Sequence, residues 1–196
     1  IIDEFCTKIK GLFPIISSPK TVNRVREAGI KIHWFHPLID YNEGSKSFNG
    51  LTAKIVKAKK DGGLPALQTG GNVGTTSWFV GWQVLKYSTI GLIGMNHGWD
   101  EQDDPSQIIT HGHENPNAEV DPSVTNITFK KIYNPDFNCY CIMDPIYQCY
   151  SNALKEFITR SPKWLSTINA TEGGSIFGEK ITSMQLLEFI EKNHGK

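Results

Sequence analysis

The sequence predicts an α/β protein with a Rossmann-like fold, in which a doubly wound, mostly parallel sheet carries helices on both faces. In the first half of the chain, short apolar runs alternate with longer stretches of helical character. The apolar runs are nearly continuous, which is typical of parallel strands that are covered on both sides. With 196 residues, the chain has the usual size of one domain, so we expect residues 1–196 to form a single Rossmann-like domain.

The elements of the first half are expected in strict alternation. Residues 1–10 predict an amphipathic helix, and residues 12–16 predict a buried strand. Ser18 is a good N-cap and Pro19 suits the first helical turn, so the next helix begins there and is closed by Gly29. Further along, the pattern predicts strands at 30–35, 64–69 and 89–94, a polar loop at 36–50, and helices at 51–60 and 73–86.

The second half begins with a segment of different character. Residues 95–124 have no clear period, and a long irregular segment in a compact domain is usually functional or disordered. One or two strands are expected over 125–143. Asp144 and Pro145 then open a helix that runs to about Thr159. The remaining elements are a strand at 164–169, a glycine-bearing turn and a terminal helix at 181–193.

The composition narrows the possible partners and the compartment. Lys and Arg together number 20, as do Asp and Glu, so charge gives no argument for nucleic acid or for an anionic membrane as a partner. No apolar run approaches the roughly 18–20 residues of a membrane span. The four cysteines have no zinc-binding spacing and are expected to be buried thiols, which fits a reducing, cytoplasmic setting. The chain opens in helical sequence without a methionine, and we expect it to begin inside a longer protein.

The stretch TGGNVGTT, residues 69–76, is the first candidate site. It follows a predicted strand and opens a predicted helix, where free backbone N–H groups attract phosphate and glycines let a ligand approach closely. It is neither a Walker motif nor GxGxxG. A tight strand-to-helix turn and a phosphate site are equally good interpretations of the stretch alone. The phosphate interpretation assigns ligand contacts to Thr69, Gly70, Gly71, Asn72, Gly74, Thr75 and Thr76.

A second glycine turn, TEGG at 171–174, follows another predicted strand. Because the carboxyl ends of parallel strands meet at one edge of a sheet, both turns should reach the same edge. Glu172 is then a candidate for contact with a substrate or a metal. A helix-capping role for Thr171 or Glu172 is an alternative of equal weight.

The irregular segment supplies the third candidate group. Asp100, Asp103 and Asp104 are carboxylates without nearby thiolates, a combination that suits Mg²⁺. His111 and His113 form an HxH pair, which can suit a transition metal, and one of them could act as a general base. A solvated acidic loop with incidental histidines is the alternative.

Three stretches of the chain resemble the MptE-like family, the 6-hydroxymethylpterin pyrophosphokinase-like and motility-associated factor proteins. They are TGGNVGTTSWFVGWQVLKYSTIGLIGMNHGW, DPIYQCY and NATEGGSIFG, and the resemblance covers roughly residues 60–190. It implies a Rossmann-like fold. For the archaeal branch it implies Mg²⁺-dependent transfer of diphosphate from ATP to the hydroxymethyl group of a reduced pterin, with release of AMP. For the motility branch it implies transfer of a nonulosonic sugar from a CMP-sugar to flagellin.

The first stretch also looks like the nucleotide-binding region of bacterial sialyltransferases, where a similar turn holds CMP and a later histidine is the base. Carried over by position, the resemblance implies that Glu172 and Gly173 lie across one pocket from the residues that line the nucleotide phosphates. Those residues are Gly70, Gly71, Asn72, Gly74 and Thr75.

This chain departs from the family at Asn96, where many relatives have aspartate in a Gly-Met-Asp motif. A neutral amide cannot be an anionic metal ligand or a base, so Asp100 or His97 would have to take over such a role. The N-terminal aspartate motifs that we associate with true pterin pyrophosphokinases are also not visible.

The leading hypothesis is a nucleotide-dependent transferase that moves pyrophosphate from ATP to 6-hydroxymethyl-dihydropterin or a similar alcohol. The glycine turn would hold the phosphates, Asp100, Asp103 and Asp104 would hold Mg²⁺, and His111 or His113 would take the hydroxyl proton. The alternatives are a CMP-sugar-dependent glycosyltransferase and a non-catalytic nucleotide-binding module. The sequence does not specify the acceptor or the oligomeric state.

Overall fold

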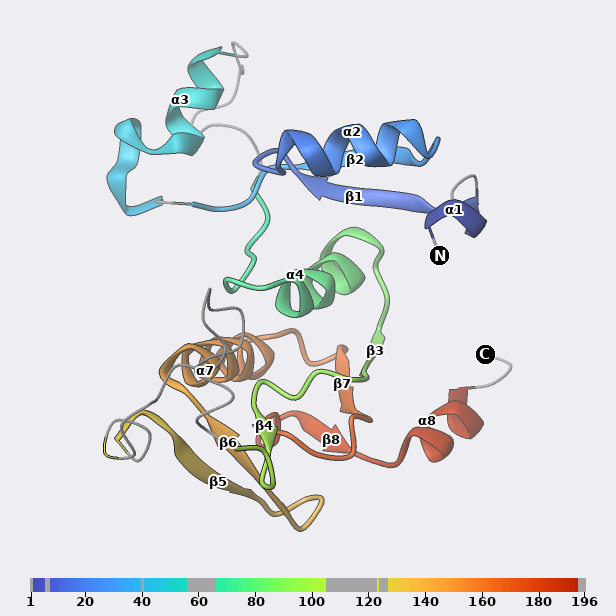
Figure 1. Cartoon of the computed structure of the whole chain (residues 1–196), viewed down its shortest axis with the longest axis vertical. Coiled ribbons are helices and arrows are strands. Elements are labelled where there is room, and N and C mark those ends of the chain that lie inside the picture. Colours follow the sequence, from blue (N-terminus) through green and yellow to red (C-terminus); the bar gives the residue numbers. More distant parts are fainter. Residues whose placement is uncertain are drawn as a thin grey trace. The chain divides into compact units, whose positions relative to one another are not determined.

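The computed structural model describes residues 2–5, 8–39, 41–55, 66–104, 123 and 127–193. The chain divides into two compact units, Ile1–Thr69 and Gly70–Lys196 (Figure 1). Both units combine helices with strands, so the α/β class is confirmed. The described strands form three small sheets, two of them parallel and one antiparallel. The single domain expected from chain length stays a prediction.

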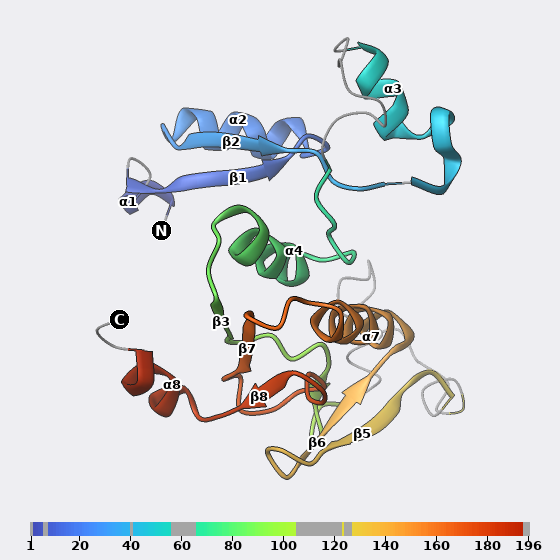
Figure 2. The same cartoon turned by 180° about the vertical axis from the view of Figure 1, so that it is seen from behind.

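The first unit is built around a parallel pair of strands with a helix in the connection. Strand β1 (Lys10–Pro14) pairs with β2 (Lys31–Phe35), and α2 (Pro19–Glu27) runs alongside them in both views (Figures 1 and 2). As predicted, the side chain of Ser18 caps α2 by accepting a hydrogen bond of 3.2 Å from the Thr21 N–H group. Gly29 follows with φ of 75°. The remaining elements are α1 (Ile2–Phe5), a 3₁₀ helix η2 (Tyr41–Lys46) and α3 (Phe48–Ile55).

Three boundaries in this unit differ from the prediction. Of the helix expected over residues 1–10, the described part contains α1, whereas Lys10 lies in β1 because it pairs with Lys31 of β2. The loop expected over 36–50 ends early, because the Ser47 side chain accepts from the Gly50 N–H group at 2.9 Å and starts α3. Of the strand expected at 64–69, the described part makes one parallel bridge, between Leu67 and Pro37.

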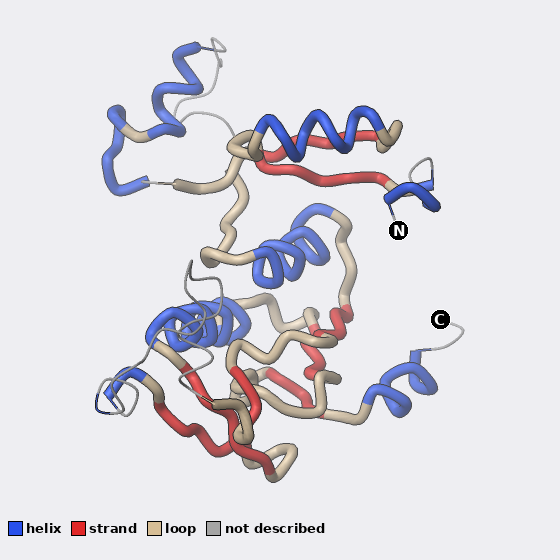
Figure 3. Tube along the Cα trace, in the orientation of Figure 1, coloured by secondary structure: helices blue, strands red, loops and turns tan. Residues whose placement is uncertain are grey.

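The described residues of the second unit form two sheets. The parallel sheet has the order β3-β7-β8, with β3 (Thr89–Leu92), β7 (Ser166–Asn169) and β8 (Ile181–Ser183). The antiparallel sheet has the order β4-β6-β5, with β4 (Trp99–Asp100), β5 (Lys130–Asn134) and β6 (Cys139–Met143). Helices among the described residues of this unit include α4 (Val73–Phe79), its π-helical continuation η3 (Val80–Val84), α7 (Pro145–Thr159) and α8 (Leu186–Asn193); Figure 3 separates helices from strands.

Helix α7 has the bounds that the sequence predicted. The Asp144 carboxylate accepts a hydrogen bond of 2.7 Å from the Tyr147 N–H group and so caps its first turn. Leu154 and Ile158 lie four residues apart on this helix and are completely buried. Trp78 of α4 is also buried, and its indole N–H group donates to Thr167 of β7 at 3.0 Å. The core of this unit therefore includes α4 and α7, which meet at the Phe79 and Phe157 rings, and α4 contacts the parallel sheet through Trp78.

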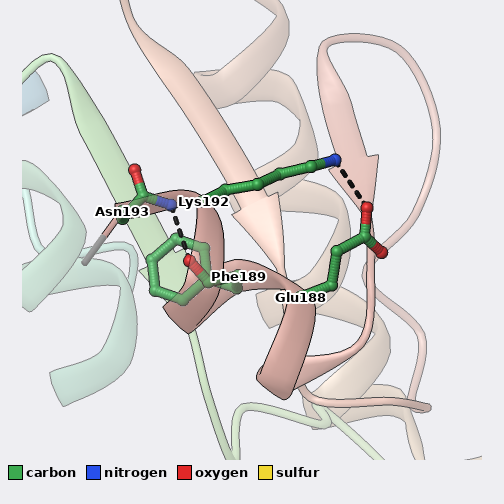
Figure 4. Close-up of polar contacts among 4 residues, drawn as sticks. All are labelled: Glu188, Phe189, Lys192 and Asn193. Atoms are coloured by element: carbon green, nitrogen blue, oxygen red, sulfur yellow. Dashed lines mark hydrogen bonds and ion pairs between the residues drawn. The ribbon is translucent and has the colours of Figure 1, made fainter.

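The C-terminal segment differs from the single helix predicted over 181–193. Residues 181–183 pair with β7 instead, and α8 begins at Leu186. Within α8, the Lys192 ammonium group lies 2.5 Å from the Glu188 carboxylate, and the Asn193 amide donates to the Phe189 carbonyl at 2.8 Å (Figure 4). A Cβ atom at Gly91 of β3 would lie 2.5 Å from the Phe189 ring, so the missing side chain lets α8 pack against the sheet. None of the helices among the described residues has the length and apolar character needed to cross a membrane.

Candidate functional site

A cleft of about 450 Å³ lies in the second unit, after the carboxyl end of β3. In α/β sheets, ligands bind preferentially beyond the carboxyl ends of parallel strands. Three segments line the cleft: the start of α4, the loop that follows β3, and the first turns of α7. The lining residues are Asn72, Gly74, Gly94, Met95, Asn96, His97, Gly98, Trp99, Tyr147 and Tyr150. None of these residues carries a carboxylate, an ammonium or a guanidinium group.

The first glycine turn is tightly folded. Gly70 and Gly71 have φ angles of 57° and 82°, in the left-handed region that favours glycine. A Cβ atom at Gly71 would lie 2.8 Å from the Tyr150 ring, so this glycine lets the turn approach α7. The Asn72 side chain accepts from the Thr75 N–H group at 2.9 Å and donates to the Gly70 carbonyl at 3.3 Å. These contacts account for the tight turn, one of the two interpretations of the sequence.

The residues predicted to bind phosphate occupy different positions around this turn. Asn72 and Gly74 line the cleft. Thr75 is completely buried, and the Thr76 hydroxyl donates to the Asn72 carbonyl at 2.8 Å within the first turn of α4. Thr69 is the last residue of the first unit, where its N–H group donates to the Gln68 side chain at 3.1 Å.

The second glycine turn fixes the backbone of the loop that lines the cleft. The Thr171 hydroxyl accepts from the Met95 N–H group at 3.3 Å, and the Ser175 N–H group donates to the Asn96 carbonyl at 2.9 Å. A Cβ atom at Gly174 would lie 2.5 Å from the same carbonyl oxygen, so glycine permits this close approach. The turn thus positions a wall of the cleft without lining it.

Glu172 is exposed and its carboxylate accepts from the Leu186 N–H group at 3.0 Å, at the start of α8. This contact fits the helix-capping interpretation of the residue. The Gly173 carbonyl accepts from the Asn169 amide at 3.5 Å. Neither Glu172 nor Gly173 is among the residues that line the cleft.

His97 has the most unusual environment in the cleft. It is 7% exposed, and its φ angle of 46° is uncommon for a residue other than glycine. Its Nδ1 atom is buried and has no hydrogen-bond partner within the described part of the chain. Burial lowers the pKa of His97 from 6.5 to about 4, so the imidazole is neutral at pH 7. A buried, neutral histidine held in an uncommon backbone conformation is a feature of functional sites.

The predicted metal ligands are not gathered in the cleft. The Asp103 carboxylate accepts from the Asp100 N–H group at 2.9 Å, so it closes a local turn after β4. Asp100, Asp103 and Asp104 are all absent from the cleft lining. Among the described residues, no group of three or more His, Cys, Asp and Glu side chains is arranged to hold a metal ion. His111 and His113 lie outside the described residues.

From the sequence, only Asn72 and Gly74 of the cleft lining were predicted to contact a ligand, and His97 was considered only as a substitute for an aspartate. Trp99, Tyr147 and Tyr150 stand in stretches that carry the family resemblance, but no role was predicted for them. Tyr147 and Tyr150 lie three residues apart on a helix whose start was predicted. Their side chains are therefore expected on the same face of that helix. That spacing was the available signal, whereas nothing local indicated that this face would meet the loop after β3.

Comparison of the chain with models of protein families, with curated proteins and with solved structures gave no match in any of the three.

Proposed function

We propose that the chain is a nucleotide-dependent transferase of the MptE-like type, with a nucleotide and a small alcohol as substrates in the cleft. One observation carries the proposal: a cleft beyond the carboxyl end of a parallel strand combines a glycine turn at a helix start with a buried, neutral histidine. Glycine turns at helix starts suit phosphate groups, and a neutral imidazole suits proton transfer near pH 7.

The strand arrangement supports the Rossmann-like part of this proposal. Strands β3 and β7 are parallel neighbours, and the connection between them contains α7 together with the antiparallel strands β4, β5 and β6. Parallel neighbours joined through a helix are the repeating unit of doubly wound sheets. The loops that follow β3 and β7 are also joined by the hydrogen bond between Thr171 and Met95. The two loops therefore meet at one edge, as ligand sites in such sheets require.

The preferred reaction is pyrophosphoryl transfer from ATP to 6-hydroxymethyl-dihydropterin or a similar alcohol. The hydroxyl oxygen attacks the β-phosphorus, the bond from that phosphorus to the oxygen of the α-phosphate breaks, and AMP leaves. Such transfers depend mainly on positioning and on stabilisation of charge. A histidine acts as the general base that takes the hydroxyl proton. His97 is the preferred base because it lines the cleft, and His111 and His113 are kept as alternative bases.

The roles of the predicted residues become more specific in this proposal. Asn72 and Gly74 contact the phosphates, because they line the cleft at the start of α4. Gly70 and Gly71 shape the turn that presents them. Mg²⁺ remains the expected companion of the phosphates. Asp100, Asp103 and Asp104 do not form a group of three ligands that could hold this ion. No step is therefore assigned to the metal.

A CMP-sugar-dependent glycosyltransferase is the second candidate. The observation that favours it is the neutral imidazole of His97 in the cleft lining. The sialyltransferases that the glycine turn resembles use a histidine as base. In that reaction the acceptor hydroxyl attacks the anomeric carbon and CMP leaves.

Calorimetric binding of ATP, AMP, CMP and a CMP-sugar, each with and without Mg²⁺, tests the proposal and separates the two candidates. Phosphorus NMR of a mixture with ATP and 6-hydroxymethyl-dihydropterin then follows formation of AMP. We expect ATP to bind and AMP to appear. Selective binding of CMP would favour the glycosyltransferase. Binding without turnover would leave a nucleotide-binding module, and no binding of any nucleotide would refute both candidate reactions.

A further inference from the structure

Lys155 of α7 has no ion-pair partner among the described residues, and its side chain is half-buried. Its ammonium group lies over the Phe177 ring, 4.2 Å from the ring centroid. Other lysines of this unit are held by anions or carbonyls: Lys131 and Lys192 each pair with a glutamate, and Lys180 donates to two backbone carbonyls. Lys155 is therefore a partly buried cation without a counterion.

Cys141 of β6 is the titratable neighbour that acts on Lys155. The two groups lie close enough to influence each other's pKa, and burial raises the pKa of the Cys141 thiol to about 11. The thiol is therefore protonated and uncharged at pH 7, so it is not a counterion for the ammonium group. Glu156, the next residue of the helix, pairs with Arg160 instead. Lys155 thus faces an aromatic ring and a neutral thiol.

These surroundings favour the neutral form of the Lys155 amine. Burial lowers the pKa of Lys155 below 10.5, because the ammonium group loses part of its hydration and no carboxylate replaces it. The Phe177 ring attracts the cation, but the loss of hydration is the larger effect. A neutral amine is the nucleophilic form of lysine, and lysines become reactive in this way when they are partly desolvated.

We propose that Lys155 is a modification site that accepts a small activated acyl group from a donor of the acyl phosphate class. The amine nitrogen attacks the acyl carbon, the bond from that carbon to the phosphate oxygen breaks, and inorganic phosphate leaves. The nitrogen gives up one proton to water and is left in an amide bond. Neither Lys155 nor Phe177 lines the cleft, so the site is separate from the proposed substrate site.

Acylation would weaken a contact between α7 and the second glycine turn. Phe177 follows Ser175 and Ile176, which are completely buried, and the Ser175 N–H group donates to the Asn96 carbonyl of the cleft wall at 2.9 Å. The amide formed at Lys155 carries no positive charge, so its cation–π attraction to Phe177 is lost. The modification therefore acts on the segment that supports the cleft.

Competitive labelling with a trace of acetic anhydride measures the pKa and the reactivity of each lysine on the unmodified full chain, with peptide mass spectrometry as the readout. Lys163 is the matched control, because it is an exposed lysine of the same unit. We expect Lys155 to be labelled at least about threefold faster than Lys163 at pH 7.5, because each unit by which a pKa falls raises the neutral fraction about tenfold. In guanidinium chloride the two lysines should be labelled alike. A pH midpoint for folded Lys155 that equals or exceeds that of Lys163 overturns the inference.

Acetyl phosphate then tests the proposed class of donor. We expect it to acetylate Lys155 before Lys163, and Lys155→Arg should remove the label from that peptide while leaving the labelling of Lys163 unchanged. Faster acetylation of Lys163 than of Lys155 by acetyl phosphate overturns the inference, whatever the midpoint with the anhydride. Both measurements are made without nucleotide, so their outcome is independent of the proposed transferase activity.

Discussion

The Ser175 hydroxyl donates a hydrogen bond of 3.0 Å to the backbone carbonyl of His97. It thereby ties the loop after β7 to the loop after β3, at a residue whose φ angle of 46° is uncommon outside glycine. Ser175 is completely buried, and its Oγ atom also lies 3.0 Å from Ser151 Oγ on α7. One hydroxyl group therefore joins three segments behind the cleft.

Ser175→Ala should destabilise the protein by about 1–3 kcal/mol, because it leaves buried polar groups without their partner. Urea denaturation measures the change. Ser166→Ala is the control, since Ser166 is exposed at the start of β7 and its replacement should change stability by less than about 0.5 kcal/mol. Equal effects of the two variants would contradict the joining role of Ser175.

Replacement of His97 should show the backbone strain directly. Because φ is 46° at this position, His97→Gly should be more stable than His97→Ala by about 1 kcal/mol. Both variants lack the imidazole, so the difference between them reports the backbone alone. Urea denaturation of the pair checks the value. A His97→Ala variant at least as stable as His97→Gly would show that this residue is not strained.

The same histidine should make stability depend on pH. Its pKa is about 4 when folded and close to 6.5 when unfolded, so the unfolded state binds more protons between these values. The stability contributed by the neutral form is fully present above pH 6.5 and is lost as the pH falls toward 4, by about 1.4 kcal/mol per pH unit. Urea denaturation at pH 5 and pH 7.5 tests this. His97→Asn is the reference variant, and it should lose less stability than the unmodified protein on acidification.

Gly74→Ala should weaken ATP binding about tenfold while changing stability by less than about 1 kcal/mol. The new Cβ atom would lie 2.8 Å from the terminal methyl group of Met95, a flexible side chain that lines the cleft and would have to shift. Gly81→Ala is a matched control, because its Cβ atom would meet the end of the Ile90 side chain at 2.9 Å away from the cleft. Calorimetric titration with ATP compares the two. A similar loss of ATP affinity in both variants would contradict the proposed contact between Gly74 and the ligand.

Glu172→Ala should leave ATP affinity unchanged and reduce stability by about 0.5–1 kcal/mol, because the carboxylate caps α8 and does not line the cleft. Both residues have a Cβ atom, so the φ angle of 63° affects them equally. Calorimetry and urea denaturation give the two quantities. A marked loss of ATP affinity would instead favour the ligand contact that the sequence suggested.

Local signals predicted local structure well. The caps at Ser18 and Asp144 were readable because each uses atoms within three residues of the same segment. The second glycine turn was also found after a strand, β7, whereas the first follows a single bridge at Leu67. Boundaries failed where distant pairing decided them: Lys10 pairs with Lys31, and Ile181 pairs with Thr167, so both residues lie in strands instead of the predicted helices.

The sequence alone determined that the chain is α/β, where most helices begin, and that the second glycine turn follows a strand. These properties follow from hydrophobic periodicity and from hydrogen bonds that span a few residues. Only the tertiary structure decided that the second glycine turn supports the cleft, and that His97 faces Tyr147 across fifty positions of chain. Burial, strain and the pKa of a side chain depend on which distant segments surround it, and no local pattern carries that information.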